Sequence, residues 1–180
     1  MIAGLYWLAM RTLYLLRHTV ALASAPDGDR ERRLSPAGEL AAAALGDWLR
    51  LQAPLPELAL CSPALRAQQT FALVAGRLPE RPAADIEEAI YQGDEAGLFS
   101  RLRGIEDDIA CCLVVGHNPL LHRFALALSG GGNDAALSRL MRELPPGGLV
   151  ELTFDVDDWA AIGPRRGRLR AFVTPDELEP

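Results

Sequence analysis

Four side chains that could bind an oxyanion follow apolar segments of this 180-residue chain. Arg17 and His18 end the first apolar run, where a strand would give way to a loop. Arg66 lies in the first turns of a predicted helix, and His117 follows a later apolar run. In a parallel sheet such junctions lie at one edge, where ligands of open α/β sheets bind. Together the four groups predict a cationic, donor-rich pocket of the size of a tetrahedral oxyanion.

The position of Arg66 supports this interpretation. With Ser62 as the N-cap, the macrodipole of the helix would disfavour a cation at Arg66 by up to about 1 kcal/mol. A bound anion would offset that cost, whereas the alternative is an arginine that reaches solvent or a carboxylate. Two of the three histidines fall at such junctions, and the third, His122, is predicted to be an ordinary helix residue.

The elements that must position these residues alternate between strands and helices. This alternation predicts an α/β fold, a three-layer α/β/α sandwich with a mainly parallel central sheet. The expected strands are 12–17, 57–61, 84–88, 109–115, 147–156 and 169–173, and the expected helices are 36–51, 64–77, 94–103 and 119–128.

Three serine- or asparagine-proline pairs predict helix starts, because a side-chain cap followed by proline suits the first helical positions. They are Ser35-Pro36, Ser62-Pro63 and Asn118-Pro119. The segment 23–34 is expected to be a loop whose arginines could contact an acidic surface, although a solvated loop is the commoner outcome. The glycine run 130–132 is predicted to end a helix and form a flexible loop.

Composition excludes several chemistries. All 18 basic residues are arginines, so neither a P-loop nucleotide site nor a Schiff-base lysine is available. The net charge of -6 disfavours nucleic-acid binding. The three cysteines lie in apolar runs without zinc spacing, as buried thiols of a reducing cytosol do. No serine has the flanks of a hydrolase elbow, and the Cys61–Arg66 spacing is one residue too short for a cysteine phosphatase.

The start of the chain fits neither a secretory signal nor a membrane span, because Arg11 interrupts the apolar run and no basic region precedes it. We therefore expect a cytoplasmic protein without a membrane partner. Residues 1–9 are expected to be an N-terminal extension, with Met10 as an alternative start, and residues 10–180 to form a single domain.

Four segments together resemble the histidine phosphatase superfamily, which has the phosphoglycerate mutase-like fold. They are Leu16-Arg17-His18, Leu34 to Gly38, Ser62-Pro63 through Arg66-Ala67-Gln68-Gln69-Thr70, and Gly116-His117-Asn118-Pro119. The short chain and the closing segment 172–178 are most similar to the SixA-type phosphohistidine phosphatases. The resemblance spans roughly residues 12 to 178.

The resemblance implies that His18 is a nucleophile that forms a phosphohistidine intermediate, and that Arg17, Arg66 and His117 hold the phosphoryl oxygens. No metal or other cofactor is implied. Thr19 and Asn118 are expected to border the bound substrate or phosphate ion.

One departure from the family pattern affects the proton donor. Val20 stands where many relatives carry an acidic residue, so a general acid must come from elsewhere or be unnecessary. Glu88 is the candidate acid, with a solvated carboxylate as the equal alternative and Glu87 as a competitor. A pocket poor in acids favours a phosphohistidine in a protein, because imidazole is a better leaving group than an alkoxide. The alternatives are a small phosphoester, such as a nucleotide or sugar phosphate, and a non-catalytic phosphate- or phosphoprotein-binding module.

Overall fold

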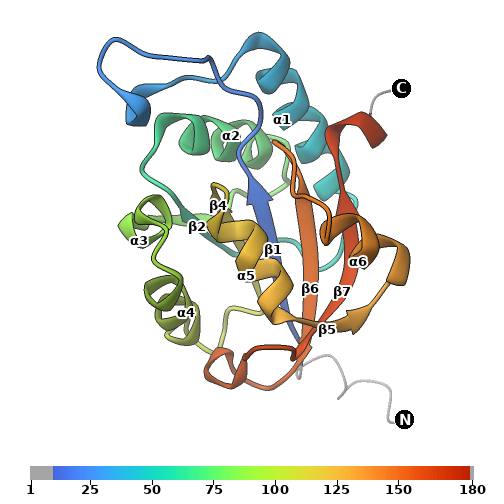
Figure 1. Ribbon diagram of the computed structural model, residues 1–180. Helices are drawn as coiled ribbons and strands as arrows, with labels where there is room; N and C mark the ends of the chain where they lie inside the picture. The colour runs from blue at the N-terminus through green and yellow to red at the C-terminus, as the bar shows by residue number, and fades with distance from the viewer. Residues whose placement is uncertain (1–9, 179–180) are drawn as a thin grey trace.

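A computed structural model describes residues 10–178, and its centre is a seven-stranded mixed sheet (Figure 1). The strands are β1 (Met10–Arg17), β2 (Leu58–Cys61), β3 (Ala83–Ile86), β4 (Cys111–Gly116), β5 (Ser129–Gly132), β6 (Leu149–Asp155) and β7 (Gly167–Val173). Their spatial order is β3-β2-β4-β1-β6-β7-β5. Within this sheet β6 runs antiparallel to both of its neighbours, and the other pairings are parallel. The predicted α/β fold with a mainly parallel sheet is therefore confirmed.

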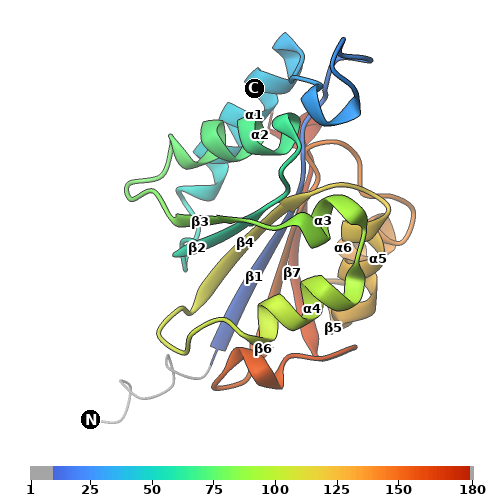
Figure 2. The same cartoon turned by 90° about the vertical axis from the view of Figure 1, so that its left-hand side faces the viewer.

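Helices cover both faces of the sheet, which gives the three predicted layers (Figure 2). On one face lie α1 (Pro36–Leu49) and α2 (Leu65–Ala75). On the other lie α3 (Glu88–Gln92), α4 (Glu95–Arg103), α5 (Leu120–Leu128) and α6 (Asp134–Leu140). Short 3-10 turns occur at η1 (Asp29–Glu31), η2 (Trp159–Ala161) and η3 (Pro175–Glu177). Among the described residues, no helix has the length and apolar character that a membrane crossing requires.

The unbroken apolar character of β1 follows from its central place. Leu13 and Leu15 belong to the core beneath α4, α5 and α6, whereas Tyr14 and Leu16 belong to the core beneath α1 and α2. A strand covered on both faces needs apolar residues at every position, so its sequence does not alternate. Burial on both faces holds β1 in place, and β1 ends at the candidate site.

Helices begin within about three residues of all three pairs, but the predicted side-chain cap forms at only one of them. Ser35 caps α1, since its Oγ accepts the Gly38 N–H at 3.1 Å. The N-cap of α2 is Ala64, and that of α5 is Pro119, and neither makes a side-chain cap. Ser62 and Asn118 are instead engaged in contacts within the candidate site, described below.

The prediction of a flexible loop at 130–132 is wrong, because these glycines form β5 beside β7. A Cβ at Gly130 would lie 1.9 Å from the Arg165 carbonyl oxygen, and one at Gly132 would lie 2.2 Å from that of Leu169. The strand thus needs glycine for close backbone approach, a requirement that strand propensity does not reveal. The predicted extension, residues 1–9, lies outside the described residues.

Candidate active site

The three predicted junctions meet at the carboxyl ends of β1, β2 and β4. Register pairs Arg17 with Gly116, and the His18 N–H donates to the Gly116 carbonyl at 2.9 Å. On its other side, the Arg17 N–H donates to the Gly148 carbonyl at 3.0 Å, and the Gly147 N–H lies 3.1 Å from the carbonyl oxygens of both Arg17 and His18. The backbone of the Arg17-His18 pair is therefore held from two sides.

One hydrogen bond sets the tautomer of His18. Its Nδ1 lies 2.7 Å from the Thr19 carbonyl oxygen, which can only accept, so Nδ1 carries the proton. The lone pair of Nε2 then accepts the Arg66 Nε–H at 3.2 Å. The result is a buried, oriented imidazole with its basic nitrogen beside a guanidinium.

Ser62 orients His117 in a similar way. Its Oγ accepts the Ala64 N–H at 3.3 Å and lies 2.6 Å from His117 Nε2. The other ring nitrogen of His117, Nδ1, is buried and has no hydrogen-bond partner among the described residues. The His18 and His117 ring centroids are 5.1 Å apart. A buried ring nitrogen without a partner thus lies beside the His18 imidazole.

Further side chains complete the pocket. The Nη1 of Arg17 and the Nδ2 of Asn118 donate to the same carbonyl, that of Leu144, at 2.9 and 2.8 Å. Arg17 Nε and Asn118 Oδ1 are buried and lack a hydrogen-bond partner within residues 10–178. Thr19 is fully buried, and its N–H donates to Thr70 Oγ1 at 3.2 Å. Arg17 therefore keeps a spare donor for an anion, whereas Thr19 serves the packing behind the histidine.

Asp29 of η1 contacts Arg66 in two ways. Arg66 Nη1 donates to the Asp29 backbone oxygen at 2.6 Å, and Nη2 donates to Asp29 Oδ2 at 2.9 Å. The other carboxylate oxygen of Asp29 accepts from Arg32 at 3.0 Å. The pKa of Asp29 is lowered, first by its hydrogen bond with Arg32, so the carboxylate is ionised at neutral pH.

The candidate acid Glu88 is directed elsewhere. The third strand ends at Ile86, before the predicted boundary, and Glu88 is the first residue of α3. Its half-exposed carboxylate forms an ion pair with Arg30, whose guanidinium also covers the Tyr91 ring at 4.4 Å from the centroid. Glu87 likewise pairs with Arg101, at 2.6 Å. The structure brings together His18, Arg17, Arg66 and His117 but gives Glu88 no contact with either histidine among the described residues.

The electrostatics of the pocket keep both histidines neutral. Burial lowers the pKa of His18 to about 4, and the positive charges of Arg66, Arg17 and Arg32 add to this effect against the Thr19 hydrogen bond. Burial, with the neighbouring His18 and Arg66, lowers the pKa of His117 to about 3. A neutral imidazole beside guanidinium groups can act as a nucleophile toward a centre whose oxygens those cations hold.

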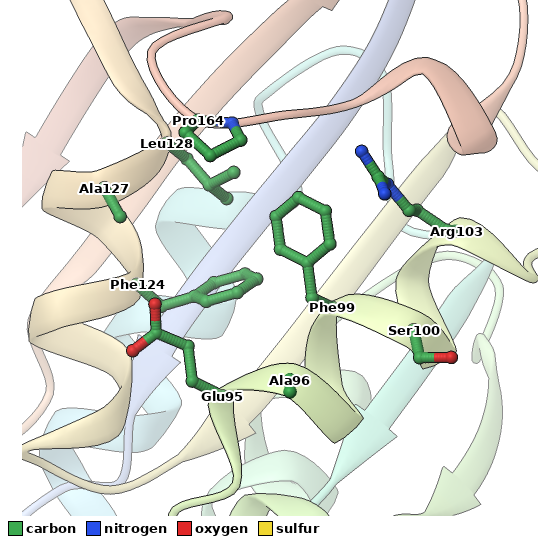
Figure 3. A pocket seen from close by; sticks show the side chains of 9 residues that line it. All are labelled: Glu95, Ala96, Phe99, Ser100, Arg103, Phe124, Ala127, Leu128 and Pro164. Atoms are coloured by element: carbon green, nitrogen blue, oxygen red, sulfur yellow. The ribbon is translucent and has the colours of Figure 1, made fainter.

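A second pocket, of about 660 Å³, lies between α4 and α5 and contains none of the predicted site residues (Figure 3). Phe99, Phe124 and Leu128 make its surface largely apolar. Arg103 lies 4.5 Å from the Phe99 ring centroid and donates to the Ile162 carbonyl, so its guanidinium is already engaged. Within residues 10–178, no three His, Cys, Asp or Glu side chains are grouped as metal ligands.

Sequence reasoning missed three contributors to the site. Asp29 lies in the predicted loop, and nothing in that mixed-charge segment indicates a contact with Arg66. Tyr91, 5.9 Å from the His117 ring, comes from α3, which was not predicted. Thr70 belongs to the recognised Arg66–Thr70 stretch, and that motif was the available signal.

Comparisons with known proteins agree with this geometry. A family model of the histidine phosphatase superfamily (branch 1) matches residues 13–95. An uncharacterized protein of Mycobacterium leprae is 32% identical over 148 residues, 82% of this chain and 89% of the relative. The structure of a candidate phosphohistidine phosphatase SixA from Nakamurella multipartitia is 27% identical, with a TM-score of 0.80, and the match covers 92% of this chain and 96% of that one.

A further solved structure, the protein histidine phosphatase SixA complexed with tungstate, matches with a TM-score of 0.73 at 22% identity over 93% of this chain and 99% of that one. At that identity the likeness establishes the fold. Taken with the sequence relatives and the residues at the sheet edge, these matches show that the chain belongs to the histidine phosphatase superfamily, as a SixA-type phosphatase.

Proposed function

We propose that the chain dephosphorylates phosphohistidine in a protein through a phosphohistidine intermediate on His18, without a metal. The observation that carries this proposal is the His18 ring, whose Nδ1–H is bound to the Thr19 carbonyl while the Nε2 lone pair lies beside Arg66. A nucleophile needs that lone pair free of a proton, and a pKa of about 4 leaves it free at neutral pH. The SixA relatives, one with bound tungstate, support a phosphorylated substrate.

In the first step, His18 Nε2 attacks phosphorus in line, and the bond from phosphorus to the substrate imidazole breaks. The other nitrogen of the substrate ring carries a proton taken from solvent, so the electron pair goes to the leaving nitrogen and the ring departs as neutral imidazole. In the second step, water attacks the same phosphorus, the bond to Nε2 breaks, and its electron pair returns to His18. The proton of the water passes to solvent, and inorganic phosphate leaves.

Charge on the phosphoryl oxygens is stabilised by Arg17, Arg66 and the Nδ1–H of His117. Cations fixed before the reaction need no reorganisation in the transition state, and this is the largest catalytic effect expected for phosphoryl transfer. Arg17 Nε and His117 Nδ1 are buried nitrogens without a partner among the described residues, and His117 Nδ1 is a donor when the Ser62 hydroxyl donates to Nε2.

The substrate class is argued from the leaving group. Imidazole is displaced readily because its protonated form has a pKa near 6.5, whereas an alkoxide needs a delivered proton. Glu88, the candidate acid, pairs with Arg30 instead. A site without a directed acid favours phosphoramidates over small alkyl phosphoesters.

The test is phosphate release in EDTA from a histidine-phosphorylated protein and from p-nitrophenyl phosphate. Wild type is compared with His18→Ala and with a His122→Ala control, which removes a histidine outside the site. We expect release from the phosphoprotein to dominate and His18→Ala to abolish it. Activity that survives His18→Ala would overturn the mechanism, and a preference for phosphoesters would overturn the substrate. Phosphate binding without any release would favour the binding module.

A further inference from the structure

Asp29 binds the guanidinium group of Arg66, which also contacts His18. All three guanidinium nitrogens of Arg66 are engaged: Nε with His18, Nη1 with the Asp29 backbone oxygen and Nη2 with Asp29 Oδ2. The Nε–H and one Nη2–H form a single edge of the planar group, the edge that binds an oxyanion through two parallel hydrogen bonds. Nη2, the second nitrogen of that edge, is the one that holds the Asp29 carboxylate, so a phosphoryl group on His18 would compete with Asp29 for this nitrogen.

We propose that Asp29 is an intramolecular competitor of the phosphoryl group, holding Arg66 until substrate displaces its carboxylate and returning to Arg66 as phosphate leaves. This inference rests on the proposed role of Arg66 in binding phosphoryl oxygens. Its consequence is a weaker affinity for phosphate and for substrate than the four cationic and donor groups would otherwise give, together with easier release of product.

The surroundings of Asp29 allow this exchange. The side chain of Asp29 is 53% exposed, so its carboxylate can turn toward water. The side chain of Arg66 is only 7% exposed, so its guanidinium stays in the pocket. Arg32 binds the other carboxylate oxygen at 3.0 Å and can keep a positive partner beside Asp29 after displacement. The contact between Arg66 and the Asp29 backbone oxygen does not depend on the carboxylate, so η1 remains anchored.

The size of the effect follows from the exposure of the carboxylate. An ion pair with one half-exposed member is weak, and a dianion loses a repulsive neighbour when the carboxylate is neutralised. Removing the charge of Asp29 should therefore tighten phosphate binding about 3- to 10-fold.

The experiment compares Asp29→Asn with Asp27→Asn, using calorimetric titration with inorganic phosphate and with tungstate in EDTA. The two variants change net charge equally within the same loop, and the Asp27 side chain makes no hydrogen bond among the described residues, so general electrostatics are controlled. We expect Asp29→Asn to bind both anions about 3- to 10-fold tighter and to lower KM for p-nitrophenyl phosphate, whereas Asp27→Asn stays within about twofold of wild type.

Two outcomes would count against different claims. Unchanged or weaker binding by Asp29→Asn, with wild type binding normally, would overturn the inference and make Asp29 a positioning residue for Arg66. Anion binding by wild type that survives Arg66→Gln at full strength would instead overturn the proposed role of Arg66, and with it the basis of the inference.

Discussion

The neutral histidines of the site should make the protein sensitive to mild acid. A histidine in an unfolded chain has a pKa near 6.5, whereas those of His18 and His117 in the folded protein are about 4 and about 3. At a pH between the unfolded and folded pKa values, the histidines of the unfolded chain bind protons that those of the folded protein do not. The stabilisation that each neutral histidine contributes is therefore fully present above pH 6.5. Below pH 6.5 the free energy of unfolding decreases as the pH drops.

The magnitude follows from the distance in pH. At pH 5 the unfolded histidine is 1.5 pH units below its pKa of about 6.5, and each unit is worth about 1.36 kcal/mol. Each site histidine should thus cost about 2 kcal/mol of stability between pH 7.5 and 5, and the pair about 4 kcal/mol. That is a large share of the 5–15 kcal/mol that is typical of a folded domain.

Urea unfolding at the two pH values, followed by tryptophan fluorescence, measures this loss. Buffers must be free of phosphate, because an anion bound in the pocket would add its own stabilisation. His18→Asn and His117→Asn should each reduce the pH-dependent loss by about 2 kcal/mol, and the double variant by about 4 kcal/mol. A His122→Asn control retains both site histidines, so its stability should fall between pH 7.5 and 5 as much as that of wild type. The reasoning is refuted if the double variant loses as much stability as wild type.

Three further outcomes are expected. Ser62→Ala removes the hydroxyl that orients His117 and should lower kcat about tenfold with little change in KM, measured with p-nitrophenyl phosphate. Gly147→Ala should destabilise the protein by about 1–3 kcal/mol in urea unfolding, because φ is +77° and the new Cβ would lie 2.5 Å from Pro175 Cγ. Gly28→Ala, where φ is +103° but nothing lies within 4 Å, is the matched control and should cost less. Activity should persist in EDTA, since guanidinium groups supply the positive charge; a loss restored by added metal would contradict this.

The contrast between predicted and missed features has a physical cause. The junction residues could be predicted because a buried parallel strand must end in residues that face a site or solvent, and motif order then identified Arg66 and His117. Strand β5 could not be predicted, because its glycines are required by a close approach of distant backbone rather than by local preference. The Asp29–Arg66 contact joins a loop to a helix 37 residues later, and the local sequence of neither segment indicates that the two will meet.

Helix caps show the same limit at shorter range. Ser35 caps α1 as its local sequence predicts, since its hydroxyl can accept the Gly38 N–H while it donates to the Val20 carbonyl at 3.2 Å. Ser62 has the same proline neighbour, yet its hydroxyl is directed to His117, which arrives from β4. The tertiary partner outweighs the local preference at the place where the site is built.

The backbone clamp on the Arg17-His18 pair links chemical competence to the completion of folding. One side of the clamp is Gly116 of β4, and the other is the Gly147-Gly148 turn, both far later in the chain than His18. A partly folded chain that holds β1 with its early neighbours alone would present an untethered histidine. Hydrolysis would therefore begin only when β4 and the turn before β6 have docked on β1, which makes turnover a reporter of that late assembly rather than of any early intermediate.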